Sequence, residues 1–233
     1  MNRFSVGRDH VQVVLMGGSA GAIGTEANCD YFAETLHRHN PHTDVKCISD
    51  SGSLYPYHTH TPLCPPHLLE FACFELWKSV SDQSCMESNP GGYNCIRSVT
   101  CFRLDLGTCC SATNAYPYVE TPILLIMSSE DTTIRICYEN DPDFWQQWRN
   151  ELAAIARTII AEKPEVGMFI PNCPFHQGLF SNLTYWGMEV PLLDSEHDSD
   201  SDVLRNLLVN FMKGEHPYQA VDDMTDRNAK CNK

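Results

Sequence analysis

Residues 11–21 read Val-Gln-Val-Val-Leu-Met-Gly-Gly-Ser-Ala-Gly. In this stretch an apolar, β-branched run leads into a G-x-S-x-G pattern, which is typical of a nucleophile elbow. A serine hydroxyl is a weak nucleophile, so it must stand on a sharp strand-to-helix turn beside a histidine that can take its proton. We therefore expect Ser19 to be a nucleophile, with Gly17 and Gly21 leaving room where a side chain would clash. The pattern predicts a serine hydrolase.

A glycine-rich turn before a helix can also bind phosphate through helix N-terminal amides. A P-loop requires a lysine directly after the glycines, but the first lysine of this chain is Lys46. The dinucleotide pattern G-x-G-x-x-G is not met either, because the glycines fall at positions 17, 18, 21 and 24. The nucleotide-binding alternatives are therefore disfavoured.

The charge and hydrophobicity of the chain indicate which kinds of partner it does not bind. The chain has 233 residues, 42% of them hydrophobic, and a formal net charge of −14. This acidity argues against nucleic acid and anionic membrane surfaces, which bind basic patches, and we interpret it as a contribution to solubility. No apolar stretch approaches the roughly 18 residues that a membrane span needs. The composition leaves the oligomeric state open.

The chain contains twelve cysteines, too many for a typical cytosolic enzyme, and seven of them fall within residues 64–110. No C-x-x-C pair occurs, so neither a zinc ribbon nor a thioredoxin-like site is expected, and we predict no metal site. The cysteines instead predict disulfides, whose pairing the sequence leaves open. Asn182-Leu183-Thr184 is a glycosylation sequon. The acidic stretch 194–202 is expected to be a solvated loop rather than a calcium site.

These features favour a secreted protein, yet residues 1–10 are polar and lack the apolar core of a signal peptide. The simplest explanation is that residues upstream of Met1 are missing.

Strand-like and helix-like segments alternate along the chain, which predicts an α/β fold with a mostly parallel sheet and flanking helices. Residues 53–118 interrupt this order, and we expect a Cys-rich insertion over the sheet edge. We assign residues 1–215 to one domain and residues 216–233 to a C-terminal tail. The predicted strands are 10–16, 44–48, 122–127 and 166–170, and the predicted helices are 20–39, 142–163 and 203–212.

Three chemically distinctive residues, Ser19, Asp131 and His176, each follow the carboxyl end of a predicted strand. In an open parallel sheet these ends lie at one edge, so the three side chains should meet there. Their chain order, nucleophile, acid and histidine, is that of α/β-hydrolases and differs from the orders of chymotrypsin and subtilisin.

Several short motifs occur in a distinctive order along the chain. They are Gly-Ser-Ala-Gly (18–21), Cys-Asp-Tyr-Phe (29–32), Val-Lys-Cys-Ile-Ser-Asp-Ser-Gly (45–52), Asn-Cys (94–95), the strand opened by Pro122, and Asn-Cys-Pro-Phe-His (172–176). In these motifs the chain resembles the pectinacetylesterase/Notum family of carboxylesterases, over roughly residues 10–215.

The resemblance implies an α/β-hydrolase-like fold with Ser19 as nucleophile, His176 as general base and Asp131 as the acid that orients it. Glu130 is the fallback for the acid. The implied reaction is two-step acyl transfer without a cofactor, with the Ala20 backbone amide donating to the oxyanion.

The family carries a second oxyanion donor on an upstream Gly-Gly-Trp segment, and the 18 residues before Ser19 contain none. We therefore expect a C-terminal portion of a family member that lacks the N-terminal strands and leaves one sheet edge unpaired. The implied substrate is an acetyl ester on an extracellular polysaccharide or a fatty acyl ester on a secreted protein. The alternatives are an impaired or inactive homologue that acts as a binding protein and a disulfide-rich scaffold.

Overall fold

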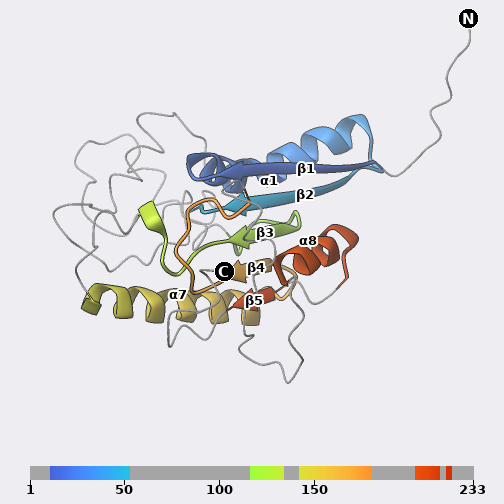
Figure 1. Ribbon diagram of the computed structural model, residues 1–233. Helices are drawn as coiled ribbons and strands as arrows, with labels where there is room; N and C mark the ends of the chain where they lie inside the picture. Colours follow the sequence, from blue (N-terminus) through green and yellow to red (C-terminus); the bar gives the residue numbers. More distant parts are fainter. Residues whose placement is uncertain (1–10, 53–115, 134–141, 180–202, 216–218, 222–233) are drawn as a thin grey trace, which may run out of the picture.

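A parallel sheet forms the centre of the structure (Figure 1). The computed structural model describes residues 11–52, 116–133, 142–179, 203–215 and 219–221. Within these residues the sheet has five strands in chain order, each paired in parallel with the next. The predicted mostly parallel sheet is confirmed. The strands are β1 (Gln12–Gly18), β2 (Asp44–Asp50), β3 (Ile123–Ile126), β4 (Gly167–Ile170) and β5 (Gln219–Val221).

Three described helices accompany the strands, and their ends follow from local residue types. Helix α1 (Ala20–His39) begins directly after Ser19 and ends at His39, because the next residue, Asn40, is extended and precedes Pro41. Helix α7 (Pro142–Glu162) begins with a proline, whose missing N–H costs nothing in a first turn. Helix α8 (Val203–Lys213) completes the set. The predicted helix bounds are confirmed to within one residue.

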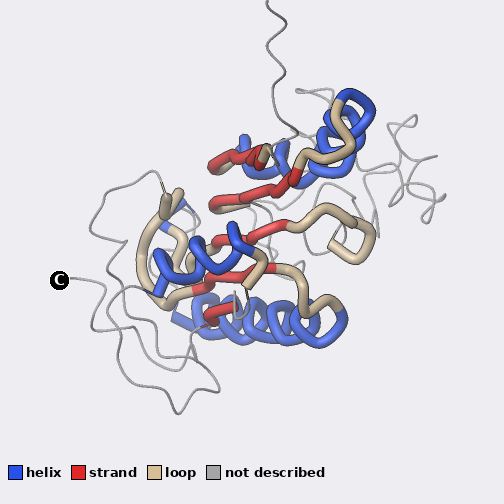
Figure 2. Tube along the Cα trace, turned by 90° about the vertical axis from the view of Figure 1, so that its right-hand side faces the viewer, coloured by secondary structure: helices blue, strands red, loops and turns tan. Residues whose placement is uncertain are grey.

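Alternate residues of the strands face two separate cores. Ile123 and Leu125 of β3 pack in one core with α7 residues such as Trp148, whereas Leu124 and Ile126 pack in the other with α8 residues such as Phe211. Helices α7 and α8 therefore cover opposite faces of the sheet. Figure 2 shows the strands one above another, with helices packed around them.

The strand bounds differ from the prediction. Strands β1 and β2 each extend two residues further, to Gly18 and Asp50, because they pair residue by residue up to that point. Strand β5 was not predicted and falls within residues 216–233, the range assigned to a tail. Its three residues are too few to show a period of two, and its pairing with β4 makes them part of the sheet.

Strand β1 is an edge strand within the described part of the chain, where it pairs with β2 alone. Val14 and Met16 on this strand are 36% and 45% exposed. The unpaired edge expected from the sequence is therefore present among these residues.

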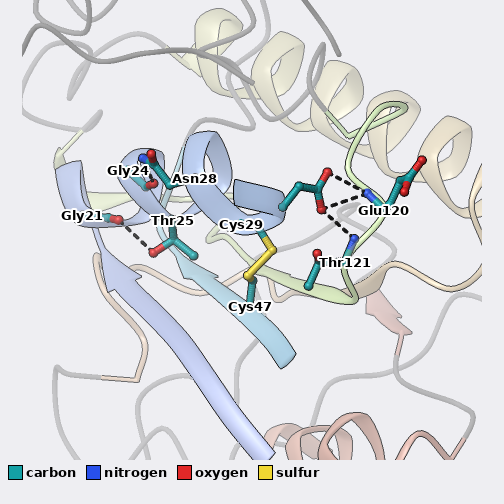
Figure 3. The surroundings of a disulfide bond; sticks show 9 residues. Gly21, Gly24, Thr25, Asn28, Cys29, Cys47, Glu120 and Thr121 are labelled. Carbon is teal, nitrogen blue, oxygen red and sulfur yellow. Dashed lines mark hydrogen bonds between the residues drawn. A yellow bond between two sulfur atoms is a disulfide. The ribbon is translucent and has the colours of Figure 1, made fainter. Parts of the chain in front are cut away.

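A disulfide joins Cys29 of α1 to Cys47 of β2, with an S–S distance of 2.07 Å (Figure 3). Cys173 is also disulfide-bonded. No described helix is both long and apolar enough to cross a membrane. The predicted insertion up to residue 115, the sequon at Asn182 and the stretch 194–202 lie outside the described residues.

Candidate active site

Ser19 lies on the sharp turn between β1 and α1. Its backbone has φ 55° and ψ −122°, a conformation that non-glycine residues rarely adopt. Backbone hydrogen bonds hold it: its N–H donates to the Asp50 carbonyl at 2.8 Å, and its own carbonyl accepts the N–H groups of Ala22 at 2.9 Å and Ile23 at 3.3 Å. This is the strained strand-to-helix turn expected of a nucleophile elbow.

The two glycines of the G-x-S-x-G pattern differ in their surroundings. A Cβ at Gly17 would lie 2.1 Å from the Gly21 carbonyl oxygen and 2.7 Å from Thr25 Oγ1, so Gly17 permits a close backbone approach, as expected. Among the described residues, no atom lies within 4 Å of a Cβ built at Gly21. The expectation that a side chain at Gly21 would clash is therefore wrong, because only the Gly21 backbone makes the close approach.

The structure brings Ser19, His176 and Asp131 together at the carboxyl edge of the sheet. His176 Nε2 lies 2.7 Å from Ser19 Oγ, although 157 residues separate them. His176 Nδ1 lies 2.8 Å from one carboxylate oxygen of Asp131 and 3.1 Å from the other. An ionised carboxylate only accepts, so Nδ1 carries the proton and Nε2 is left to accept the Ser19 hydroxyl. The three groups can thus pass a proton from serine to histidine.

Burial and charge tune the imidazole. Asp131 is fully buried, and the His176 side chain is 18% exposed. The hydrogen bond that His176 Nδ1 donates to Asp131 raises the pKa of His176 above its usual value, burial opposes this, and the charges of Asp131 and Asp50 add to the increase. His176 is therefore a stronger base than a free imidazole, as a proton acceptor requires.

Glu130, the fallback for the acid, has a different partner. Its carboxylate pairs with Arg149 of α7 at 3.5 Å. The hydrogen bonds from His176 Nδ1 go to Asp131 instead.

The loops that carry Asp131 and His176 are bonded to each other. Ser128 Oγ donates to the Cys173 carbonyl, and Ser129 Oγ donates to Asn172 Oδ1 at 2.7 Å. The Thr132 N–H donates to the Phe175 carbonyl at 3.3 Å. The acid and the histidine are therefore held by a common scaffold.

A second set of bonds comes from residues without a role in the sequence analysis. The side chains of Asp50 and Ser51, at the end of β2, accept the N–H groups of residues 177–179, directly after His176. The sequence signal was present, since Ser49-Asp50-Ser51-Gly52 follows a predicted strand at the same sheet edge. A link to backbone amides, however, leaves no trace in side-chain spacing.

The oxyanion prediction concerns the Ala20 N–H. Helix α1 begins at Ala20, so this N–H has no intrahelical acceptor and can serve an external one. Within the described residues, no group of three or more His, Cys, Asp or Glu side chains could hold a metal ion.

The sequence and the fold were compared with those of known proteins. The family profile described as pectinacetylesterase matches residues 8–135, which include Ser19 and Asp131. The fold is similar to two crystal forms of the Wnt deacylase Notum from Drosophila, with TM-scores of 0.66 (form I) and 0.64 (form II). Sequence identities are 18% and 19%, and each alignment covers 95% of this chain.

The alignments cover 60% and 59% of the two Notum chains, so this chain spans about three fifths of their length. No curated protein sequence matches it. The matched profile extends over more than half of the chain. His176 lies beyond the matched residues, and the structure places it beside Ser19 and Asp131. The chain belongs to the pectinacetylesterase family.

Proposed function

We propose that this protein is a serine carboxylic ester hydrolase in which Ser19 is the nucleophile, His176 the general base and Asp131 the orienting acid. The observation that carries the proposal is the hydrogen-bonded chain from Ser19 Oγ through His176 to Asp131, at 2.7 Å and 2.8 Å. Membership of the pectinacetylesterase family supports the ester substrate.

In the proposed reaction, Ser19 Oγ attacks the ester carbonyl carbon while His176 Nε2 takes its proton. The oxyanion forms near the Ala20 N–H, at the positive end of α1. His176 then returns the proton to the leaving alcohol, and an acyl-Ser19 ester remains. Water, deprotonated by the same imidazole, attacks this ester and releases the carboxylic acid with Ser19 regenerated. No cofactor takes part.

The proposed substrates are acetyl or fatty acyl esters on an extracellular polysaccharide or protein. The Notum structures bear the description Wnt deacylase, and the family bears the description pectinacetylesterase, so removal of an acyl group and removal of an acetyl group both occur among the descriptions of similar proteins. The disulfide between Cys29 and Cys47 supports an oxidising, extracellular location.

Labelling with a fluorophosphonate probe, located by mass spectrometry, tests the proposal. We expect label on Ser19 that Ser19→Ala abolishes and His176→Ala reduces strongly. Thr158→Ala is the matched control, because it removes an exposed hydroxyl of α7 that bonds only its own helix. Folded protein without label would refute the hydrolase and favour a binding protein that retains the inherited residues. If label appears, p-nitrophenyl acetate compared with octanoate then distinguishes the acyl classes.

A further inference from the structure

The segment directly after His176 is held by the side chains of Asp50, the last residue of β2, and Ser51, which follows it. The Gln177 N–H donates to Ser51 Oγ at 2.7 Å. The Gly178 and Leu179 N–H groups donate to the two carboxylate oxygens of Asp50, at 2.8 Å and 2.7 Å. Three consecutive backbone donors thus end on two adjacent side chains rather than in a helix or sheet.

The backbone on both sides of this contact is strained. Ser51 has φ 60° and Gln177 has φ 62°, in the left-handed region that favours glycine. Such residues persist only where the surrounding structure holds them. The bond between these two residues, together with the Asp50 bonds beyond it, is what holds them.

The burial of Asp50 strengthens the same interpretation. Its side chain is fully buried, which is costly for a carboxylate that lacks donors. The pKa of Asp50 is raised above its usual value because burial outweighs the N–H groups of Leu179 and Gly178, which lower it. The ionised form of this carboxylate therefore depends on the loop that it binds.

We infer that Asp50, assisted by Ser51, is a positioning residue that holds the His176 loop so that Nε2 stays in line with Ser19 Oγ. This inference rests on the proposed function and adds a residue to it. The backbone of Asp50 contributes as well, because its carbonyl accepts the Ser19 N–H at 2.8 Å. One residue thereby sets the distance between the nucleophile turn and the histidine loop.

Charged groups approach this region from several elements. Asp131 contacts the imidazole from the loop after β3, and Asp50 acts on it as a second negative charge from β2. Glu26 of α1 bonds Ser49, the neighbour of Asp50. The Glu130 carboxylate is paired with Arg149. Among these groups, Asp131 and Asp50 are the two charges that raise the pKa of His176.

The test substitutes Asp50→Asn, which keeps the size but places an amide NH₂ against one of the two N–H donors. We expect turnover and the rate of Ser19 labelling to fall about 10- to 100-fold with little change in KM, as for a misplacement of up to about 1 Å. The loss of one negative charge should also lower the pKa of His176 and move the acid limb of the pH profile to lower pH.

Asp30→Asn is the matched control. Asp30 also accepts two consecutive backbone N–H groups, those of Glu120 at 3.0 Å and Thr121 at 2.8 Å, but before β3 and thus at the opposite end of the sheet (Figure 3). We expect it to reduce stability without moving the labelling rate or the acid limb. Equal effects of Asp30→Asn and Asp50→Asn on these readouts would overturn the inference.

Ser51→Gly guards against the possibility that Asp50→Asn unfolds the protein. It removes the hydroxyl that binds the Gln177 N–H, while glycine accepts the positive φ of Ser51 without strain. We expect a smaller loss of labelling rate in a protein that remains folded. A wild-type rate in folded Ser51→Gly would contradict the role of the contact.

An NMR titration separates this inference from the proposed function. The imidazole signal of His176, assigned with His176→Gln, reports its pKa whether or not the protein turns over substrate. A lowered pKa together with faster hydrogen exchange at the Gly178 and Leu179 amides in Asp50→Asn would support positioning even if wild type does not label. An unchanged pKa and unchanged exchange would refute it, even if wild type is an active hydrolase.

Discussion

The strain at Ser19 predicts that replacing it by glycine gives a more stable protein than replacing it by alanine. Both substitutions remove the hydroxyl and its bond to His176, so the comparison isolates the backbone. At φ 55° and ψ −122° a residue with a Cβ is disfavoured by about 1–3 kcal/mol. Glycine avoids this strain but loses about 0.5–1 kcal/mol more conformational entropy on folding than alanine. The net advantage of Ser19→Gly is about 1 kcal/mol.

For a chain of this length, about 1 kcal/mol corresponds to a Tm difference of roughly 2–4 °C. Urea unfolding and thermal melts of the two variants, made side by side, measure it. Thr158 provides the control, because it is an exposed residue in the interior of α7. There, Thr158→Gly should be less stable than Thr158→Ala by about 1 kcal/mol, the opposite sign. If Ser19→Gly is also the less stable member of its pair, the strained conformation of the turn is refuted.

Three further outcomes are expected. Gly17→Ala should destabilise the fold by about 3 kcal/mol or more, because the new Cβ would lie 2.1 Å from a backbone oxygen. Gly21→Ala should be neutral or stabilising by up to about 1 kcal/mol. Chemical denaturation of the two variants measures this difference. Replacing both Cys29 and Cys47 by alanine should cost about 3 kcal/mol, since the disulfide joins residues 18 positions apart. The difference between wild type and variant should vanish when both are measured under reducing conditions. Because the pKa of His176 is raised, kcat/KM should increase as the pH rises through that pKa and the imidazole becomes neutral. The stability that the charged imidazole contributes is complete below about pH 6.5 and should be lost over the same increase in pH. If activity and unfolding free energy instead rise together with pH, this assignment is contradicted.

The sequence predicted the helices better than the strand ends, for a physical reason. Helix limits depend on nearby residues: Pro142 opens α7, and Pro41 follows the end of α1. The end of a parallel strand depends on its neighbour. Residues 17–18 and 49–50 read as turn residues, yet Gly18 pairs with Asp50 and the strands continue. Strand β5 was missed because its place in the sheet is set by β4 and not by its own three residues.

The sequence likewise predicted some parts of the candidate site and not others. Strand ends and chain order indicated Ser19, His176 and an acid after the third predicted strand, and the family resemblance preferred Asp131 to Glu130 as that acid. The structure places His176 within hydrogen-bond distance of both Ser19 and Asp131. The contacts of the Asp50 side chain could not be predicted in the same way. Its acceptors serve backbone N–H groups 128 and 129 residues away, and backbone donors are identical at every non-proline position.

These contacts explain how residues 157 positions apart come to lie within hydrogen-bond distance. Neither Ser19 nor His176 lies in a regular strand, so the sheet register alone does not fix their separation. Asp50 supplies the missing constraint, because its carbonyl accepts the Ser19 N–H and its carboxylate accepts two N–H groups beyond His176. A substitution that spares the backbone but alters this carboxylate should therefore leave the Ser19 turn intact and displace only the histidine. This arrangement predicts that Asp50→Asn leaves hydrogen exchange at the Ser19 amide unchanged and changes the imidazole pKa. A general weakening of the fold would instead speed exchange at both places.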